Sequence, residues 1–363
     1  MNKRTFFKGG LALLAMTSLL AGCDPNKSAE SKDGKETKAP ETTKPPTTIS
    51  ANAPKFKVIT NGISPFWDSM GKGLDAAKAE LSVNADWQAP NPSQHTEQVT
   101  IVKDAAAAKV DGIAVSPIEA DALTATIDET IAGGVPVITF DSDAPKSKRL
   151  AYLGTNNYEA GKMAGEATAK LLPKGSKLVA FVGNMGAQNA RDRYQGFVDA
   201  VKDKGIEFLQ APFEDNKDKG RAVSNVSDAI TKYGDKIAGF VGFYSYNGPA
   251  IVNAVKQAGI RNKVKIVCFD GEPDTLKNLE QGLVDVTVVQ KPYEFGRLSV
   301  KLLNELKKTG DIKKAIEALK PELDKMGMKV KEGNIIDTGV TIVTPANAAE
   351  FLKDLKAKGL EST

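Results

Sequence analysis

The sequence contains a single histidine and only two cysteines among its 363 residues, so several kinds of chemistry lack the residues that they require. His95 has no second histidine to join it, which argues against histidine-rich metal sites and Ser–His nucleophilic catalysis. The thiols of Cys23 and Cys268 are too few for a disulfide framework or a zinc motif. We predict a surface position for His95, near a helix start. The apolar run 264–269 predicts that Cys268 is a buried core thiol.

Other absences limit the partners of the protein. The formal net charge is only +4, and loss of Lys3, Arg4 and Lys8 with a cleaved signal peptide would leave +1. A chain with so small a net charge lacks the excess of positive charge that is typical of nucleic-acid-binding proteins. The glycine-rich nucleotide fingerprint is missing too, because residues 183–186, Gly-Asn-Met-Gly, lack the third glycine and the spacing. We therefore predict no nucleic-acid partner, no cofactor and no metal.

The start of the chain has the layout of an export signal. Basic residues precede the apolar run Leu11–Ala21, which is too short to span a bilayer, since that takes about twenty apolar residues. The run ends Leu20-Ala-Gly-Cys23, which looks like a bacterial lipobox. That resemblance implies a signal peptide over 1–22 and a lipid on the thiol of Cys23. The alternative is an ordinary signal peptide with an incidental cysteine.

A polar segment follows the candidate lipidation site. Residues 24–53 are mostly Lys, Glu, Thr, Ser, Pro and Ala, and Ile49 is their only large apolar residue. Such a composition cannot bury enough surface to offset its ordering entropy, so 23–53 is predicted to be a disordered linker with a reach of roughly 30 Å. Together these features predict an exported lipoprotein of the cell envelope, tied to the membrane by its N-terminal lipid alone.

From residue 56 onward, short β-branched runs alternate with amphipathic stretches, which predicts βαβ units and parallel sheets. About 310 residues remain after the linker, enough for two lobes of ordinary size. The predicted fold class is α/β, with two doubly wound three-layer (αβα) lobes. The predicted strands are Phe56–Asn61, Gly112–Pro117, Pro136–Ser142, Ala151–Asn156, Lys177–Gly183, Ile206–Phe213, Ile237–Tyr244, Val264–Gly271 and Asp285–Gln290. The predicted helices include Phe66–Leu81, Ala120–Ile131, Tyr158–Leu172 and Asn189–Lys204.

Aromatic and planar polar side chains recur just after these strands. Ligands of open α/β sheets bind at the carboxyl ends of the strands, so we take these residues as candidate ligand-binding residues. An aromatic ring packs against the C–H face of a sugar, while carboxylates, amides and guanidinium groups pair with its hydroxyls. The candidates are Ser64, Phe66, Trp67, Asp141, Ser142, Arg193, Asp215, Tyr244, Asp270 and Gln290.

Each candidate also has a plainer interpretation. Phe66 and Trp67 could be core residues at helical spacing, Asp141 a helix cap, and Arg193 a solvated helix charge. No strand end pairs a nucleophile with a base, so we predict that the protein is not an enzyme.

With these residues in view, the chain resembles the type I periplasmic sugar-binding proteins of ABC transporters, the group of the ribose-, xylose-, allose- and galactose-binding proteins. The resemblance runs from residue 56 to about 345. It is carried by Ser64-Pro-Phe-Trp67, Val135-Pro-Val-Ile-Thr-Phe-Asp141, Arg191-Asp-Arg-Tyr-Gln-Gly-Phe197, Val267-Cys-Phe-Asp-Gly-Glu-Pro-Asp274 and Thr287-Val-Val-Gln290.

The resemblance implies a three-strand hinge between the lobes, with crossings near 156–157, near 290–291 and after residue 320. The N-terminal lobe would comprise 54–157 plus about 291–325, and the C-terminal lobe 158–290 plus about 330–363. It also implies stacking by Phe66 and Trp67 and hydrogen bonding by Asp141, with Ser64 and Ser142 beside it. Arg193, Asp270 and Gln290 would complete the polar ring from the second lobe.

The chain also departs from the ribose-type pattern. Ser142 stands where that pattern has an arginine, Asp215 where it has a phenylalanine, and Tyr244 near its asparagine. A ribose ligand is therefore in doubt, while a pentose, hexose or related polyol is not.

The implied function is that of a monomeric, lipid-anchored receptor that captures a monosaccharide and presents it to an ABC permease. The same cleft would serve a sensor of a sugar, polyol or autoinducer that signals to a membrane receptor or kinase. A repressor of the lactose-repressor type would need a DNA-binding helix pair before residue 56, where the polar linker lies instead.

Overall fold

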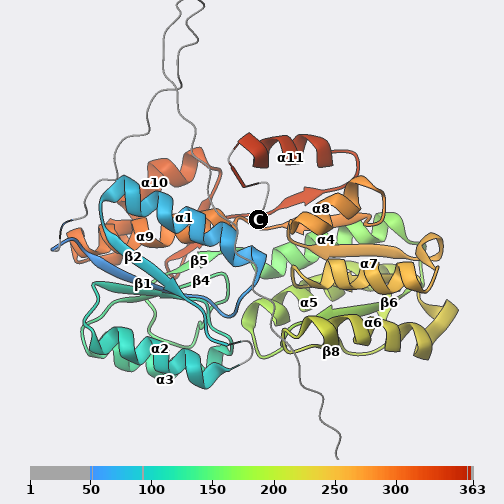
Figure 1. Ribbon diagram of the computed structural model, residues 1–363, viewed down its shortest axis with the longest axis horizontal. Coiled ribbons are helices and arrows are strands. Elements are labelled where there is room, and N and C mark those ends of the chain that lie inside the picture. The colour runs from blue at the N-terminus through green and yellow to red at the C-terminus, as the bar shows by residue number, and fades with distance from the viewer. Residues whose placement is uncertain (1–49, 51, 92–93, 358, 361–363) are drawn as a thin grey trace, which may run out of the picture. The chain divides into compact units, whose positions relative to one another are not determined.

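A computed structural model describes residues 50, 52–91, 94–357 and 359–360 of the chain. The predicted signal peptide, Cys23 and nearly all of the predicted linker lie outside the described residues. Residues 47–363 form one unit, which contains two seven-stranded sheets. Each sheet carries helices on both faces (Figure 1).

The first sheet has the strand order β12-β13-β5-β4-β3-β1-β2, and all of its neighbours are parallel except the hairpin β12–β13. Its strands are β1 (Lys55–Ile59), β2 (Asn84–Gln88), β3 (Gly112–Val115), β4 (Val137–Phe140), β5 (Tyr152–Gly154), β12 (Lys329–Lys331) and β13 (Ile335–Asp337). One face packs against α1 (Pro65–Leu81), α9 (Pro292–Thr309) and α10 (Ile312–Lys325), and the other against α2 (His95–Ala107) and α3 (Ala120–Ala132).

The second sheet has the order β14-β11-β10-β9-β6-β7, with β8 also paired to β6. Its strands are β6 (Lys177–Val182), β7 (Glu207–Phe208), β8 (Phe213–Glu214), β9 (Gly239–Gly242), β10 (Lys265–Phe269), β11 (Val286–Val289) and β14 (Thr341–Val343). The helices α4 (Asn157–Leu171) and α5 (Gln188–Val201) cover one face. The helices α6 (Lys219–Tyr233), α7 (Asn247–Gln257), α8 (Pro273–Glu280) and α11 (Ala348–Ala357) contribute to the core of the other face.

Burial on both faces explains the composition of the central strands. All four residues of β3, β4, β9 and β11 are buried, and they read as apolar runs rather than as an alternation of apolar and polar residues. Cys268 is fully buried in β10, as predicted. His95 begins α2 with its side chain 46% exposed, so its predicted surface position is confirmed as well.

The chain passes between the sheets at the ends of three elements. It leaves the first sheet after β5, returns after β11, and crosses again between β13 and β14. We take these crossings to divide the unit into lobe 1, around the first sheet, and lobe 2, around the second. Because β13 pairs with β5, lobe 1 extends to Asp337 and not to about residue 325 as expected from the sequence.

The α/β class, the two lobes and their parallel sheets are confirmed. Every predicted strand is present, although the range Ile206–Phe213 holds the short strand β7 and, after a bend, only the first residue of β8. The helix predicted over 189–204 ends at Val201 and continues as a short 3-10 helix, Lys202–Lys204. Four strands, β2, β12, β13 and β14, were not predicted. These strands lie at or near sheet edges and are largely polar or only three residues long, so they lack the apolar runs of the central strands.

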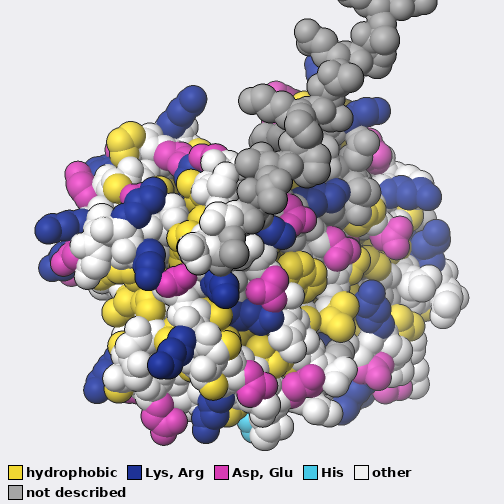
Figure 2. Space-filling view, turned by 60° about the vertical axis from the view of Figure 1, so that its left-hand side comes forward, with side chains coloured by type: hydrophobic (Ala, Val, Ile, Leu, Met, Phe, Trp, Pro, Cys, Tyr) yellow, Lys and Arg dark blue, Asp and Glu magenta, His cyan; other side chains and the backbone are white. Residues whose placement is uncertain are grey.

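Figure 2 shows lysine and arginine side chains interspersed with aspartate and glutamate on one face of the molecule, in keeping with the small net charge. Within the described part of the chain, no helix combines the length and the apolar character needed to cross a membrane.

Candidate functional site

A pocket between the carboxyl ends of the two sheets brings together most of the predicted site residues. Its cavity volume is about 60 Å³. Lobe 1 contributes the segment 61–67 and Asp141, and lobe 2 contributes the remainder. The predicted residues on the wall are Ser64, Phe66, Trp67, Asp141, Arg193, Tyr244, Asp270 and Gln290. The wall also includes Asn61, Gly62, Ile63, Asn189, Lys217, Lys219, Ser245 and Tyr246, none of which was predicted.

Asp141 and Asp270 occupy equivalent places in the two lobes. Each follows a central strand, β4 or β10, after a phenylalanine, and each has a left-handed backbone, with φ of 59° and 68°. The amide of Asp141 donates to Leu153 O in β5, and that of Asp270 donates to Val288 O in β11. A left-handed conformation is strained for residues other than glycine and persists only where the surroundings fix it.

A hydroxyl from the neighbouring strand fixes each of these two turns. Tyr152 in β5 donates its hydroxyl to the carbonyl of Asp141 at 2.7 Å, and Thr287 in β11 donates to that of Asp270 at 2.6 Å. The side chains of both aspartates are thereby directed into the pocket from opposite lobes.

Polar groups of lobe 1 hold the carboxylate of Asp141. Its Oδ2 accepts hydrogen bonds from Ser116 Oγ at 2.9 Å and from Asn61 Nδ2 at 3.3 Å. Burial raises the pKa of Asp141 to about 6, because desolvation outweighs the opposing charge of Arg193. Asp141 precedes no helix, so the alternative of a helix cap is wrong.

Arg193 is the largest side chain that is almost fully buried, with 2% exposed, so it is not a solvated helix charge. Its Nε donates to Asn157 Oδ1 at 2.9 Å and its Nη1 donates to Phe243 O at 2.8 Å. The guanidinium lies 4.7 Å from the centre of the Phe269 ring, within range of a cation–π contact. Its Nη2 has no hydrogen-bond partner among the described residues.

Two further pocket residues carry buried polar atoms without a partner. Gln290 donates from Nε2 to Asp270 Oδ1 at 3.1 Å, but its Oε1 accepts no hydrogen bond from the described residues. The same holds for Oδ1 of Asn189 at the start of α5. Leaving a buried polar atom unpaired costs about 1–3 kcal/mol. One donor and two acceptors on the pocket wall therefore suit a ligand that can both accept and donate.

The aromatic residues of lobe 1 belong to the core and to the pocket at once. The ring centres of Phe66 and Trp67 are 4.8 Å apart, with the rings nearly perpendicular, and Trp67 lies 5.8 Å from Phe140. Both side chains are at most 9% exposed, and both line the pocket. Pro65 opens α1 just before them, and Ser64 is the N-cap residue but makes no side-chain cap bond.

Tyr244 and Tyr246 form the aromatic wall of lobe 2, with nearly perpendicular rings 6.1 Å apart. A Cβ atom on Gly183, at the end of β6, would lie 2.4 Å from the Tyr244 ring. Glycine is therefore required at that strand end for the ring to occupy its position.

Two predicted site residues are not on the pocket wall. Asp215 is fully buried behind it, where Oδ1 accepts from the Tyr246 hydroxyl at 2.6 Å and Oδ2 accepts from Asn247 Nδ2 at 2.9 Å. Ser142 is also fully buried, and its hydroxyl has no partner among the described residues. A position just after a strand is thus not sufficient to place a residue on the pocket wall, since the direction of its side chain decides whether it faces the pocket.

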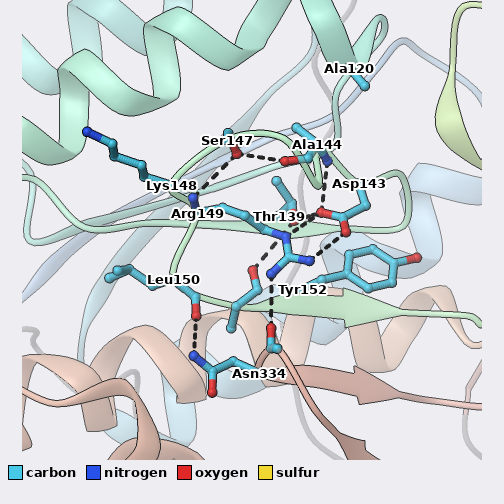
Figure 3. A network of polar contacts seen from close by, with 12 residues as sticks. Ala120, Thr139, Asp143, Ala144, Ser147, Lys148, Arg149, Leu150, Tyr152 and Asn334 are labelled. Atoms are coloured by element: carbon cyan, nitrogen blue, oxygen red, sulfur yellow. Dashed lines mark hydrogen bonds and ion pairs between the residues drawn. The ribbon is translucent and has the colours of Figure 1, made fainter.

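A salt bridge between Arg149 and Asp143 holds the loop that follows β4 and Asp141 (Figure 3). Arg149 donates to both carboxylate oxygens of Asp143, at 2.6 and 2.7 Å, and also to Gly333 O at 3.2 Å. Asn334 donates from Nδ2 to Leu150 O at 2.9 Å. These bonds tie the loop after β4 to the β12–β13 hairpin, close to the last crossing between the lobes.

A larger cavity of about 370 Å³ shares Phe66, Asp270 and Gln290 with this pocket. It is bordered mainly by the crossing segment 289–294 and by α11, and it lacks Asp141, Arg193 and Asn189. The smaller pocket is therefore the candidate site, because the convergent polar groups lie there. No group of three or more potential metal-ligating residues occurs in the described part of the chain.

Comparison with known proteins agrees with this geometry. The model of the periplasmic binding protein domain matches residues 56–311. The ribose import binding protein RbsB of Bacillus subtilis is 26% identical over 285 residues, which cover 76% of this chain and 90% of that protein. RbsB of Escherichia coli is 27% identical over 271 residues, or 72% of this chain and 88% of that protein. The chain belongs to the type I periplasmic sugar-binding family.

Solved structures of the same fold come from several bacteria. A solute-binding protein of Burkholderia graminis in complex with D-arabinose has a TM-score of 0.72 at 30% identity and covers 82% of this chain and 97% of its own. The glucose-galactose binding protein GanP of Geobacillus stearothermophilus has a TM-score of 0.71 at 29% identity, covering 82% and 99%. The XylFII–LytSN complex matches with a TM-score of 0.71 at 25% identity, covering 81% and 98%.

Membership in this family places the protein among sugar-binding transport proteins, which are not enzymes and work outside the cytoplasm. The resemblance read from the sequence motifs is thereby confirmed.

Proposed function

We propose that the protein binds a monosaccharide in the pocket between its lobes and presents it to the permease of an ABC importer. The main support is a set of three buried polar atoms on the pocket wall that have no hydrogen-bond partner in the described part of the chain, Arg193 Nη2, Gln290 Oε1 and Asn189 Oδ1. Sugar hydroxyls donate and accept, so one small ligand can satisfy all three. The aromatic rings of both lobes add surface for the C–H faces of a sugar ring.

The arrangement of these groups supports a closing mechanism. Asp141 and the aromatic pair of lobe 1 face Arg193, Asp270 and Gln290 of lobe 2, and only lobes that are close together contact the ligand from both sides. A ligand shifts a conformational equilibrium only as far as it prefers one state. Binding would therefore favour the closed form, which is the form that the permease recognises.

A thermal-shift screen of the purified protein against pentoses, hexoses, polyols and autoinducer-type diols tests this proposal. A ligand at about a thousand times its dissociation constant adds roughly 4 kcal/mol of stability, or several degrees in Tm. The shift should vanish in Asp141→Ala and Arg193→Ala and persist in Asp121→Ala, which removes an exposed carboxylate. A cooperative melt with no shift for any compound would refute the sugar assignment and leave the fold intact.

Lipid attachment at Cys23 is the second part of the proposal. It rests on the sequence Leu20-Ala-Gly-Cys23 and the polar segment that follows. Expression in a bacterium fed a labelled fatty acid should give a labelled protein in the membrane fraction, and Cys23→Ala should be unlabelled. A parent protein without label would contradict lipidation of Cys23 and favour an incidental cysteine at that position.

A sensory role is the second candidate, because one of the matching solved structures is a complex of XylFII with a second protein, LytSN. In such a role the closed form would bind a membrane receptor or kinase. Co-purification in the presence of the sugar distinguishes the two, since an importer should retain its permease and a sensor should retain a receptor.

A further inference from the structure

The charged groups predicted for the pocket do not balance. Asp141 and Asp270 contribute two carboxylates, and Arg193 contributes one guanidinium. The structure adds Lys217, a residue that the sequence analysis did not single out. It follows β8 in lobe 2 and reaches the segment after β1 in lobe 1.

A strained turn gives Lys217 this position. Asn216 and Lys217 both have left-handed backbones, with φ of 54° and 65°, although neither is glycine. The buried carboxylate of Asp215 holds the turn by accepting from the amide of Lys217 at 2.8 Å, while Tyr246 and Asn247 hold that carboxylate in turn. Consecutive strained residues persist only where the surroundings fix them, and they occur preferentially at functional sites.

The ammonium group of Lys217 contacts lobe 1 directly. Nζ donates to the backbone carbonyl of Asn61 and, at 3.1 Å, to its side-chain Oδ1. Asn61 Nδ2 donates in turn to Asp141 Oδ2, so Lys217 lies one residue away from that carboxylate. An ammonium has three N–H groups, and these bonds use two of them.

Lys217 remains a cation at neutral pH. Burial lowers its pKa to about 8, and Asp141 and Asp215 oppose that effect. Together with Arg193 it offsets the two carboxylates of the wall. Lys219 also lines the pocket, but it is exposed, so water and salt screen its charge.

We propose that Lys217 sets the charge specificity of the pocket, as the second counter-charge to Asp141 and Asp270, so that the site selects uncharged sugars over sugars carrying an ammonium group. Two carboxylates facing a single guanidinium would attract a cationic amino sugar. The charge of Lys217 repels such a ligand, and specificity arises from disfavouring the wrong ligand as much as from binding the right one. This inference rests on the proposed sugar-binding function.

The test compares ligand pairs in four proteins: the parent, Lys217→Met, Lys217→Arg and Lys263→Met. D-ribose, D-arabinose, D-xylose, D-glucose and D-galactose are each titrated by calorimetry at pH 7 beside the 2-amino-2-deoxy derivative, whose amine is largely protonated there. For the neutral sugar that binds most tightly, the parent should bind that sugar more tightly than its amino derivative. Lys217→Met should reduce that preference about tenfold, equivalent to about 1.4 kcal/mol.

Lys217→Arg keeps the charge and should keep the preference. Lys263→Met should keep it too, because it removes an exposed charge of lobe 2 that lies outside the pocket wall. Thermal melts establish that each variant is folded. An unchanged preference in Lys217→Met, or an equal loss in Lys263→Met, would overturn the inference while sugar binding stands. If the parent binds no sugar, the proposed function fails and this inference falls with it.

Discussion

At the scale of single residues, the pocket buries a carboxylate whose ionised form is unfavourable there until a ligand binds. Asp141 is 3% exposed, and burial raises its pKa to about 6 from an ordinary value of 3.8. Because the folded-state pKa is the higher one, the folded protein holds the proton more tightly than the unfolded chain. The resulting stabilisation is complete below about pH 4 and is lost as the pH rises through about 6.

We therefore expect Asp141→Asn to stabilise the ligand-free protein at pH 8 by on the order of 2 kcal/mol and to abolish sugar binding. Denaturant unfolding between pH 4 and pH 8 measures this. The loss of stability with rising pH should become smaller in the variant but not disappear, because burial also raises the pKa of Asp215 to about 6. Asp121→Asn, which alters an exposed carboxylate, should follow the parent. An Asp141→Asn variant less stable than the parent at pH 8 would contradict this account.

How far the sequence predicts the site is also decided residue by residue. Strand ends revealed Asp141, Asp270 and Gln290, because a parallel sheet directs its carboxyl ends to one edge. The same rule included Asp215 and Ser142, which lie behind the wall, because their direction depends on the turn that follows the strand. Lys217 was not predicted, because its position depends on two residues with left-handed backbones. No local sequence pattern marks such residues when neither is glycine.

At the scale of elements, close helix packing determines where Arg193 lies. The helices α4 and α5 meet through glycines: a Cβ on Gly161 would lie 2.1 Å from the carbonyl oxygen of Arg193, and a Cβ on Gly196 would lie 2.0 Å from that of Tyr158. In lobe 1, Gly73 and Gly296 allow α1 and α9 to approach in the same way. Contacts of this kind connect residues far apart in the chain, so the sequence predicted α1, α4 and α5 but neither α9 nor the spacing between the helices.

We expect Gly161→Ala to weaken sugar binding by tenfold or more, because it displaces the backbone that carries the guanidinium. Gly165→Ala is the matched control on the same helix, where the added atom meets Ala200 and Phe197 instead. Both variants should lose about 1–3 kcal/mol of stability through overpacking. Thermal melts and calorimetric titrations of the two variants check this. Equal loss of affinity in both would mean that Arg193 is not positioned by this contact.

At the scale of the whole molecule, function depends on whether a ligand holds both lobes together. Asp141 and Arg193 face the pocket from lobe 1 and lobe 2, while Lys217 and Asn61 already link the lobes directly. A ligand that lost its bond to one lobe would still bind the other but would no longer favour the closed state. Binding and closure are therefore separable in this architecture.

Small-angle scattering measures closure of the lobes separately from ligand binding. The parent should become more compact when the sugar is added, seen as a decrease from a radius of gyration of roughly 20 Å, the value typical of about 310 folded residues. Arg193→Met removes the central contact of lobe 2 and weakens binding, so it should remain as extended as the ligand-free parent even at sugar concentrations high enough to saturate the weakened site. Gln195→Met on the same helix alters an exposed side chain and should compact normally. Compaction of Arg193→Met equal to the parent's would show that closure is driven by lobe–lobe contacts such as Lys217–Asn61, with the ligand only filling the space between the lobes.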